Sequence, residues 1–405
     1  MHARLLRCFS TAVVTAAASA ASLAAQAPNI QVQGRVQVQY RSSSGDSSLS
    51  GVVGYAPNLV SNVFEVRRLR IQANVRFGDN INLVIQPSFE MGSLRMRDAY
   101  LRVGLTRNVF LVAGQEKSPF QRYELTSSNN LLSIERGVRI LRLANREGLN
   151  DVLTQNGYTS HDLGAGVELE SNDHKFFVKG VVQGGSRESS ADVNNAKSFY
   201  GRVTAVALQN KDNQPVLQLG ASFGSRDRAI CVNCTTGTVT AAPVYYPDSS
   251  KATTAFGIDA EWGGFRPGLH IIADFATGDN VPVVQGPAGA QLRINSGRNT
   301  ANLRNSADSN IVTFMGVSVI AAYRVQTKGA DTRLVKFIEP AVRFDFTDPN
   351  TNANNDQGVL ITPVLNLYFA NSVQLRVGID LYMYKDANAV SRTAREIKFA
   401  WQANF

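Results

Sequence analysis

Sixteen stretches of this 405-residue chain alternate apolar and polar residues, and this pattern limits the fold more than any other feature. In 31–40, valines and a tyrosine share one face, while arginine and glutamines share the other. A period of two residues is typical of a β-strand with one apolar and one polar face. The predicted strands are 31–40, 68–77, 80–90, 94–104, 108–116, 162–170, 174–184, 199–210, 215–226, 253–263, 268–277, 311–326, 333–347, 359–370, 373–384 and 393–405.

The connections between these stretches alternate in length along the chain. Short turns such as 211–214 alternate with longer Ser-, Asn-, Gly- and Thr-rich segments such as 117–161, and the join at 91–93 breaks this order. Short turns at one end and long loops at the other, joining an even number of strands, are what a transmembrane β-barrel requires. The sheet must close because an open edge in hydrocarbon leaves backbone groups unpaired. The predicted fold is therefore all-β, a 16-stranded antiparallel transmembrane β-barrel.

A soluble β-sandwich is the alternative, with the apolar face as its core. Two observations favour the barrel. The last strand ends on Phe405, which resembles the C-terminal recognition signal of bacterial outer-membrane barrels. Aromatic residues also lie near strand ends, as in the girdles at membrane interfaces. These predicted girdle residues are Phe77, Phe89, Tyr100, Phe110, Phe344, Phe346, Phe369, Tyr382 and Tyr384.

The N-terminus has the pattern of an export signal. Arg4 and Arg7 precede an alanine-rich apolar run at 12–23, and small residues follow. We therefore predict a signal peptide at 1–27, cleaved near 24–27, and one barrel domain at 28–405. A membrane anchor is disfavoured because the run is short and alanine-rich, and nothing later approaches the ~18 apolar residues of a membrane helix.

Charge and cysteine content narrow the partners. The formal charge falls from +9 to +7 when Arg4 and Arg7 are lost, which favours small anions, and nucleic acid is a poor partner for an exported chain. Cys231 and Cys234 form one C-x-x-C with no second pair. A loop disulfide is favoured there over zinc, because export places the pair in an oxidising compartment.

Catalysis finds little support in the sequence. Outside the signal the histidines are His161, His174 and His270, which lack metal-ligand spacing. The sequence has no cluster of serine, histidine and an acidic residue that would indicate a nucleophile with its base. It also has no glycine-rich loop of the kind that binds phosphate. We predict no enzyme activity, no metal and no cofactor.

Several motifs together resemble the phosphate-selective porin O and P family. They are RRLRI at 67–71, RDAYLR at 97–102, GQEKSPF at 114–120, ELTSS at 124–128, IER at 134–136, EPAVRFD at 339–345 and LNLYF at 365–369. The resemblance implies a sixteen-stranded porin in the bacterial outer membrane, in contact with the lipid bilayer. It also implies a homotrimer, a third loop folded into the lumen, and basic residues that guide anions such as phosphate.

The family motifs place Arg67, Arg68 and Lys117 on an anion path. Strand parity agrees for Arg68 but turns Arg67 toward lipid. Either a bulge rotates the strand, or Arg67 lies in a trimer contact or the headgroup zone. The middle of the chain has few inward-facing cations, chiefly Lys179 and Arg202, so the family's arginine ladder is only partly matched.

Fixed positive charge in a narrow passage selects anions, because charges close to a solute are screened least. By parity the inward cations are Arg35, Arg68, Arg70, Arg76, Arg102, Lys179, Arg202, Arg343, Arg376 and Lys398. The predicted solute path is Lys117, Arg68, Arg70, Arg67, Arg35 and Arg102. Pairing with carboxylates is preferred for three cations, namely Arg343 with Glu339 and Asp345, Arg376 with Asp380, and Lys398 with Glu396.

The segment 114–136 does not alternate and is predicted to be the constriction loop. Within it, Glu124, Glu135 and Arg136 are expected to pin the loop to the barrel wall. Thr126, Ser127 and Ser128 either cap a short helix begun there or line the constriction.

The sequence therefore predicts a passive outer-membrane diffusion channel with anion preference, with phosphate or polyphosphate as candidate solutes. Two alternatives stay open. One is a porin for another small solute, such as a sugar acid or a peptide. The other is a non-conducting structural or adhesive barrel whose loops 227–252 and 278–310 bind partners.

Overall fold

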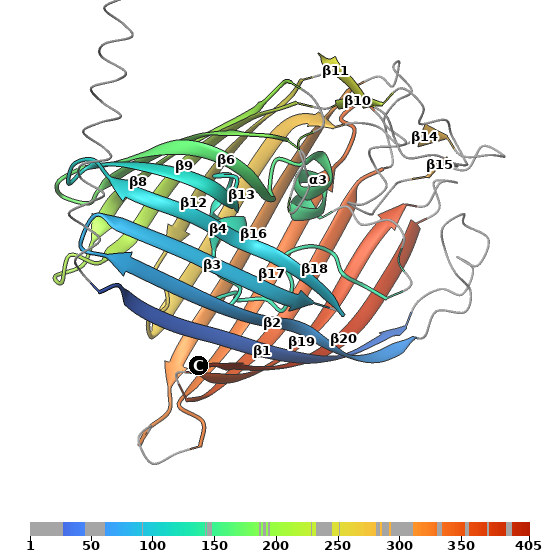
Figure 1. The fold of residues 1–405 in the computed structure, drawn as a ribbon. Helices are drawn as coiled ribbons and strands as arrows, with labels where there is room; N and C mark the ends of the chain where they lie inside the picture. The colour runs from blue at the N-terminus through green and yellow to red at the C-terminus, as the bar shows by residue number, and fades with distance from the viewer. Residues whose placement is uncertain are drawn as a thin grey trace, which may run out of the picture.

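The chain forms a closed antiparallel β-barrel in its computed structural model, and the sixteen predicted strands are all present in it (Figure 1). The described residues are 27–44, 61–90, 92–141, 143, 148–185, 188, 192, 195–227, 229–231, 245–250, 252–280, 284–285, 291–292, 311–329, 334–352, 356–370, 372–385 and 391–405. The predicted signal peptide lies almost wholly outside these residues, so the boundary near 24–27 stays a prediction.

Each barrel strand pairs with its neighbours along the chain, and β1 closes the barrel against β20. The strands are β1 (Asn29–Ser44), β2 (Asn62–Phe77), β3 (Ile81–Glu90), β4 (Ser93–Gly104), β5 (Val109–Lys117), β6 (His161–Glu170), β7 (Phe176–Gln183), β8 (Ser198–Gln209), β9 (Pro215–Arg226), β12 (Thr253–Trp262), β13 (Gly268–Asn280), β16 (Val312–Gln326), β17 (Phe337–Asp348), β18 (Gly358–Ala370), β19 (Val373–Lys385) and β20 (Ser391–Asn404).

Smaller elements are not part of the barrel sheet. Two short pairs, β10 (Ala229–Cys231) with β11 (Tyr245–Ser250) and β14 (Val284–Gln285) with β15 (Gln291–Leu292), belong to long connections. The helices α2 (Arg122–Leu125) and α3 (Leu149–Asn156) lie between β5 and β6. Within the described residues, none of the helices has the length and apolar character needed to cross a membrane.

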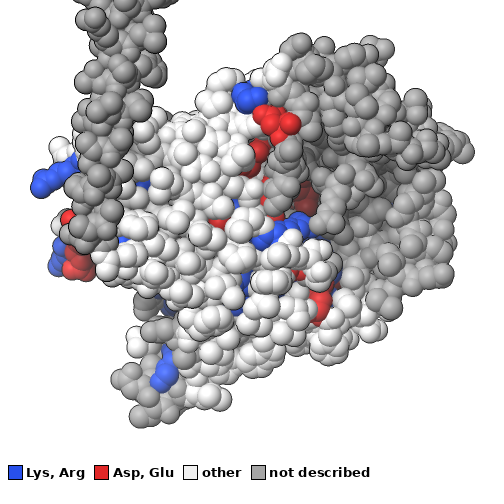
Figure 2. All heavy atoms as spheres, viewed as in Figure 1, with Lys and Arg blue, Asp and Glu red and all other residues white. Residues whose placement is uncertain are grey.

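The two faces of each strand differ as the alternation predicts. On β12, Phe256 and Ile258 point outward and are more than half exposed, whereas Asp259 and Glu261 point inward and are buried. Figure 2 shows a mostly uncharged outer wall, with basic and acidic side chains toward its two ends. Lipid can solvate this apolar surface, and the polar side chains face the lumen.

The C-terminus helps to close the barrel. Gly34 and Phe405 exchange two backbone hydrogen bonds, with N···O distances of 2.7 and 3.0 Å. A Cβ at Gly34 would lie 2.3 Å from the Phe405 ring, so only glycine fits beneath this ring. The terminal aromatic residue therefore packs onto the first strand.

The described residues between 118 and 160 fold into the barrel and pack against the inner wall. Phe120, Leu149 and Leu153 are buried against β12, β13 and β16. Leu131 and Leu132 pack onto β13 and β16, and Ile134 packs onto β18 and β20. This segment, the lumen loop, therefore has an apolar core shared with the wall.

Some of the predicted girdle residues face the lumen instead of the membrane. Tyr382 and Tyr384 face inward and are buried with Val138, Ile140 and Leu143 of the loop. Arg102 stacks on Phe110 at 3.5 Å, which places that ring with the inward Arg102. The prediction was wrong at these positions, and also at Tyr100, which shares the inward face of β4 with Arg102. It reserved the inner face for polar side chains, whereas Tyr382 and Tyr384 pack against the folded-in loop and Phe110 packs against an inward arginine.

Candidate functional site

The root of the lumen loop is held by ion pairs and buried carboxylates. Lys117 Nζ lies 3.0 Å from Glu124 Oε1, and Arg136 lies 3.5 Å from Glu124 Oε2. Asp274 of β13 accepts backbone hydrogen bonds from Arg122 at 3.1 Å and from Tyr123 at 3.2 Å. The turn that carries α2 is therefore fixed to β5 on one side and to β13 on the other.

Glu124 is held in its charged form. Burial by itself raises the pKa of Glu124, but the charges of Lys117 and Arg136 outweigh burial and lower the pKa from 4.5 to about 2. Asn150 of α3 adds a hydrogen bond of 2.9 Å to the same carboxylate. Glu124 thus joins the two halves of the lumen loop and keeps Lys117 from facing the passage as an unpaired cation.

The tip of the lumen loop contacts three arginines of the wall. Ser128 Oγ accepts hydrogen bonds from Arg35 of β1 and from Arg70 of β2, the latter at 3.4 Å. Arg376 of β19 donates to the backbone carbonyl of Asn129 at 2.9 Å. These guanidinium groups come from strands far apart in the sequence, and the loop tip brings them together.

The serine and threonine run has a different local role from the predicted helix cap. Thr126 follows α2, and its hydroxyl donates to the Arg122 carbonyl at 2.9 Å, so it caps the C-terminal end of a helix already formed. Ser127 Oγ accepts the Asn129 backbone N–H at 3.3 Å. The prediction of a helix beginning at 126–128 was wrong, because the helix precedes the hydroxyl run.

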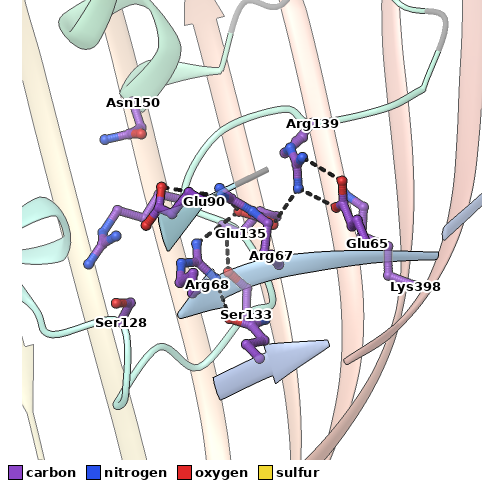
Figure 3. A network of polar contacts seen from close by, with 12 residues as sticks. Glu65, Arg67, Arg68, Glu90, Ser128, Ser133, Glu135, Arg139, Asn150 and Lys398 are labelled. Carbon is purple, nitrogen blue, oxygen red and sulfur yellow. Dashed lines mark hydrogen bonds and ion pairs between the residues drawn. The ribbon is translucent and has the colours of Figure 1, made fainter. Parts of the chain in front are cut away.

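Glu135 is the central carboxylate of the loop contact, and Figure 3 shows it among arginines of both the wall and the loop. Its oxygens lie 2.7 Å from Arg67, 3.0 Å from Arg68 and 3.2 Å from Arg139. Burial opposes the charge of Glu135, yet Arg67, Arg68 and Arg139 hold its pKa well below the usual range. Glu135 therefore holds the loop to β2, as predicted for this residue from the sequence.

Two β-bulges bring extra arginines into the lumen. The β1–β2 register moves from Gln37↔Arg68 to Val38↔Val66, which leaves Arg67 as the additional residue. The β3–β4 register shifts in the same way between Gln86 and Pro87, and Arg97 is the residue passed over. Of the two placements left open for Arg67, the structure therefore has the bulge, with the side chain directed inward to Glu135.

Glu90 of β3 lies between these bulges. Its carboxylate pairs with Arg70, with Arg97 at 2.6 Å and with Arg67 at 3.7 Å. Arg97 reaches Glu188 as well, at 2.6 Å. One carboxylate thus compensates three guanidinium groups that face the lumen.

These contacts join into one chain of ion pairs along the wall from β19 to β4. Within the described residues it contains seven basic groups and six carboxylates, namely Lys398, Arg41, Arg139, Arg67, Arg68, Arg70 and Arg97 with Asp380, Glu396, Glu65, Glu135, Glu90 and Glu188. In the part of the chain that the structure describes, no carboxylate lies within 4.0 Å of Arg35 or Arg376. The wall next to the loop tip therefore has an excess of positive charge.

Other predicted cations are placed as follows. Arg102 pairs with Glu168 at 2.6 Å, and Arg343 pairs with Asp345, with Nε 2.9 Å from Oδ1. Lys398 pairs with Asp380 and, at 3.4 Å, with Glu396.

The expected pairing of Arg376 with Asp380 was wrong, because Lys398 and Thr362 occupy that carboxylate. Glu339 likewise pairs with Arg324 rather than with Arg343. Parity alone gave the correct face for these residues, but it gave the wrong partner for Arg376 and one wrong partner of two for Arg343, whose pairing with Asp345 is confirmed.

The open part of the lumen lies against β2 and β4. The inward side chains of β2 from Arg70 onward keep partial exposure, and so do those of β4, including Asp98 and Tyr100. On β19, by contrast, every second residue from Gln374 to Tyr384 is buried. A solute passage is therefore bounded by the lumen loop on one side and by β2 and β4 on the other.

Several residues of this site were missed from the sequence. Glu65, Glu90, Arg97 and Arg139 carry the ion-pair chain but were not among the predicted site residues. A signal for the β4 bulge does exist in the sequence, since the apolar residues shift from even positions at Leu94 and Met96 to odd positions at Leu101 and Val103. Such a parity slip within one strand indicates an additional residue.

Two further predictions concern cysteine pairing and metal binding. Cys234 is not among the described residues, so its pairing with Cys231 remains a prediction. Among the described residues, no group of three or more His, Cys, Asp or Glu side chains is arranged to hold a metal ion.

Comparison with known proteins supports the family resemblance. The model of the family described as "Phosphate-selective porin O and P" matches residues 36–230. No curated protein sequence matches the chain.

Solved structures show the same fold. An anion-selective porin from Comamonas acidovorans is 8% identical, with a TM-score of 0.58 over 94% of this chain and 100% of that chain. The outer membrane channel DcaP of Acinetobacter baumannii is 12% identical, with a TM-score of 0.55 over 93% and 97% of the two chains. OmpT of Vibrio cholerae is 12% identical, with a TM-score of 0.52 over 94% and 98%.

Proposed function

We propose that this chain is a passive diffusion channel with a preference for anions. It is an outer-membrane β-barrel of the porin fold, and residues 36–230 match the phosphate-selective porin O and P family. Phosphate and polyphosphate are the leading solutes. The protein is a channel in the bacterial outer membrane and not an enzyme.

The observation that carries the anion preference is the excess of guanidinium groups around Ser128. Arg35 and Arg70 both donate to the Ser128 hydroxyl, and Arg35 has no carboxylate partner among the described residues. The charge of Arg136 also reaches Arg35. Positive charge at a narrow, partly dehydrated point is screened little by salt, so it favours anions there.

The arginines suit phosphate because a planar guanidinium donates paired hydrogen bonds to oxyanions. The Comamonas acidovorans porin, which shares the fold, is itself anion-selective. A different small anionic solute, such as a sugar acid, would use the same groups. Liposome swelling with a panel of solutes separates phosphate from sugar acids and peptides.

Reversal potentials across planar bilayers under a chloride or phosphate gradient test the proposal. We expect anion preference in the wild type and a lower anion-to-cation permeability ratio in Arg35→Gln. Arg76→Gln is the matched control, because Arg76 is an inward cation near the opposite end of β2 from the loop contact. Cation preference in the wild type, or equal effects of both variants, would overturn the proposal. Absence of single-channel steps would favour the non-conducting barrel.

We also propose a homotrimer, on the resemblance to the porin family. Native mass spectrometry of the detergent-solubilised barrel measures this directly. A monomer at all protein concentrations would contradict it.

A further inference from the structure

Arg376 is the most completely buried basic side chain of the wall behind the lumen loop. It is 0% exposed and lies on β19 beneath the loop tip. Its Nη2 donates to the Asn129 carbonyl at 2.9 Å and to Gln374 Oε1 at 3.1 Å. Its Nε and Nη1 atoms are buried and have no hydrogen-bond partner among the described residues.

The neighbouring strands place other buried polar atoms around Arg376. Ala400 of β20 pairs with Arg376 on one side and with Gln39 of β1 on the other. Arg376 and Gln39 therefore lie on either side of the small Ala400 in the register of the wall. Both amide atoms of Gln39 and the Nε2 of Gln37 are buried and unpaired within the described part of the chain.

The lumen loop closes this position from above. Ile134 packs onto Ala400, and Asn366, next to Arg376 on β18, donates to the Leu132 carbonyl at 3.0 Å. Gln37 and Gln39 are both 0% exposed. The lumen loop therefore separates the buried polar atoms around Ala400, here called the Ala400 compartment, from the solute passage.

Among the described residues, no carboxylate pairs with the charge of Arg376. The carboxylates whose charge reaches it, Glu339 and Glu135, are already paired with Arg324 at 2.6 Å and with Arg67 at 2.7 Å. A buried charge without a partner is costly, and an unmade hydrogen bond at a buried charged donor adds to that cost. A ligand with one negative charge would remove both costs.

We propose that a resident monovalent anion of the halide class, such as chloride, binds in the Ala400 compartment. Arg376 Nε and Nη1 and the amide nitrogens of Gln39 and Gln37 donate to it. A halide suits the compartment because it is spherical, accepts hydrogen bonds from divergent donors and matches the single charge of Arg376. The anion is structural, since it fastens the lumen loop to β19, and its existence does not depend on the selectivity of the passage.

Crystals of the full barrel grown in bromide test the proposal by anomalous scattering. We expect a bromide peak within hydrogen-bond distance of Arg376 and Gln39 in the wild type. The peak should be lost in Arg376→Met and kept in Arg35→Met, which removes a neighbouring lumen cation but leaves the compartment intact. Ordered water in place of bromide, or a peak that persists in Arg376→Met, would overturn the proposal.

Thermal unfolding at constant ionic strength gives a second readout that does not require crystals. Replacing gluconate by chloride should raise the Tm of the wild type, because gluconate is too large for a closed compartment. Gln39→Leu keeps Arg376 and should require more chloride for the same rise, so it serves if Arg376→Met fails to fold. Equal Tm values in chloride and gluconate for the wild type would contradict a halide site. The proposed anion preference is tested separately, by the reversal potentials of Arg35→Gln.

Discussion

The inner faces of β4 and β19 lie in the same barrel but differ in what covers them. On β4 the inward residues, among them Arg97, Asp98 and Arg102, keep partial exposure. On β19 the inward residues from Gln374 to Tyr384 are buried beneath the lumen loop. The comparison shows that one wall serves as the lining of the passage, whereas the other serves as a folding surface for the loop that narrows it.

The strongest disturbance of the covered wall is expected at Glu135. Replacing Glu135 with alanine leaves Arg67, Arg68 and Arg139 without their shared carboxylate, which should cost the loop about 3–5 kcal/mol of local stability. Hydrogen exchange of the backbone amides around 133–138 measures this loss. Glu168→Ala, which affects a pair on the open wall, is the control, and unchanged exchange in Glu135→Ala would show that the ion pairs do not hold the loop.

The apolar part of the covered wall should be nearly as sensitive. Leu153 of α3 is 0% exposed and packs in the cluster with Phe120 and Phe314. Leu153→Ala should destabilise α3 by about 2–5 kcal/mol because it leaves a cavity. Exchange of α3 amides measures the effect. Leu219→Ala on the lipid-facing side of β9 is the matched control, and equal protection in both variants would contradict a loop core.

Acid should loosen the root of the lumen loop. The pKa of Glu124 is lowered to about 2 in the folded chain against an ordinary 4.5, so its contribution to stability is present above about pH 4.5 and is lost as the pH falls toward 2. Protease sensitivity of the loop, followed from neutral pH to pH 2, should rise over that interval. Glu124→Gln should be more sensitive at neutral pH and should change less with acid. A wild-type profile with no change between pH 4.5 and 2 would exclude this role.

The smallest effect is expected on the open wall at Glu90. Glu90→Gln removes the charge that compensates Arg67, Arg70 and Arg97, and should raise the anion-to-cation permeability ratio. A change of about 0.5–1 kcal/mol, the range of partly exposed pairs, corresponds to about two- to fivefold. Reversal potentials measure it, with Gln72→Asn as a neutral control. A lower ratio in Glu90→Gln would show that these arginines do not face the solute.

The placement of charged partners was the part of the site that the sequence did not predict. Arg41 binds Glu396, which lies 355 positions away, because closure of the barrel places β20 beside β1. Arg67 and Arg97 enter the lumen only because bulges interrupt the alternation. Lys117 was expected to meet the solute, yet it pairs with Glu124 inside the loop.

The sequence by itself determined the sixteen strands, the lipid-facing side of most of them and the segment that folds inward. It could do so because alternation is a local property and because hydrocarbon forces a sheet to close. Only the tertiary structure decided which wall the loop covers, which carboxylate each arginine finds, and that Arg376 has none among the described residues. Those outcomes depend on strand register, bulges and the path of the loop, which join residues that no local pattern relates.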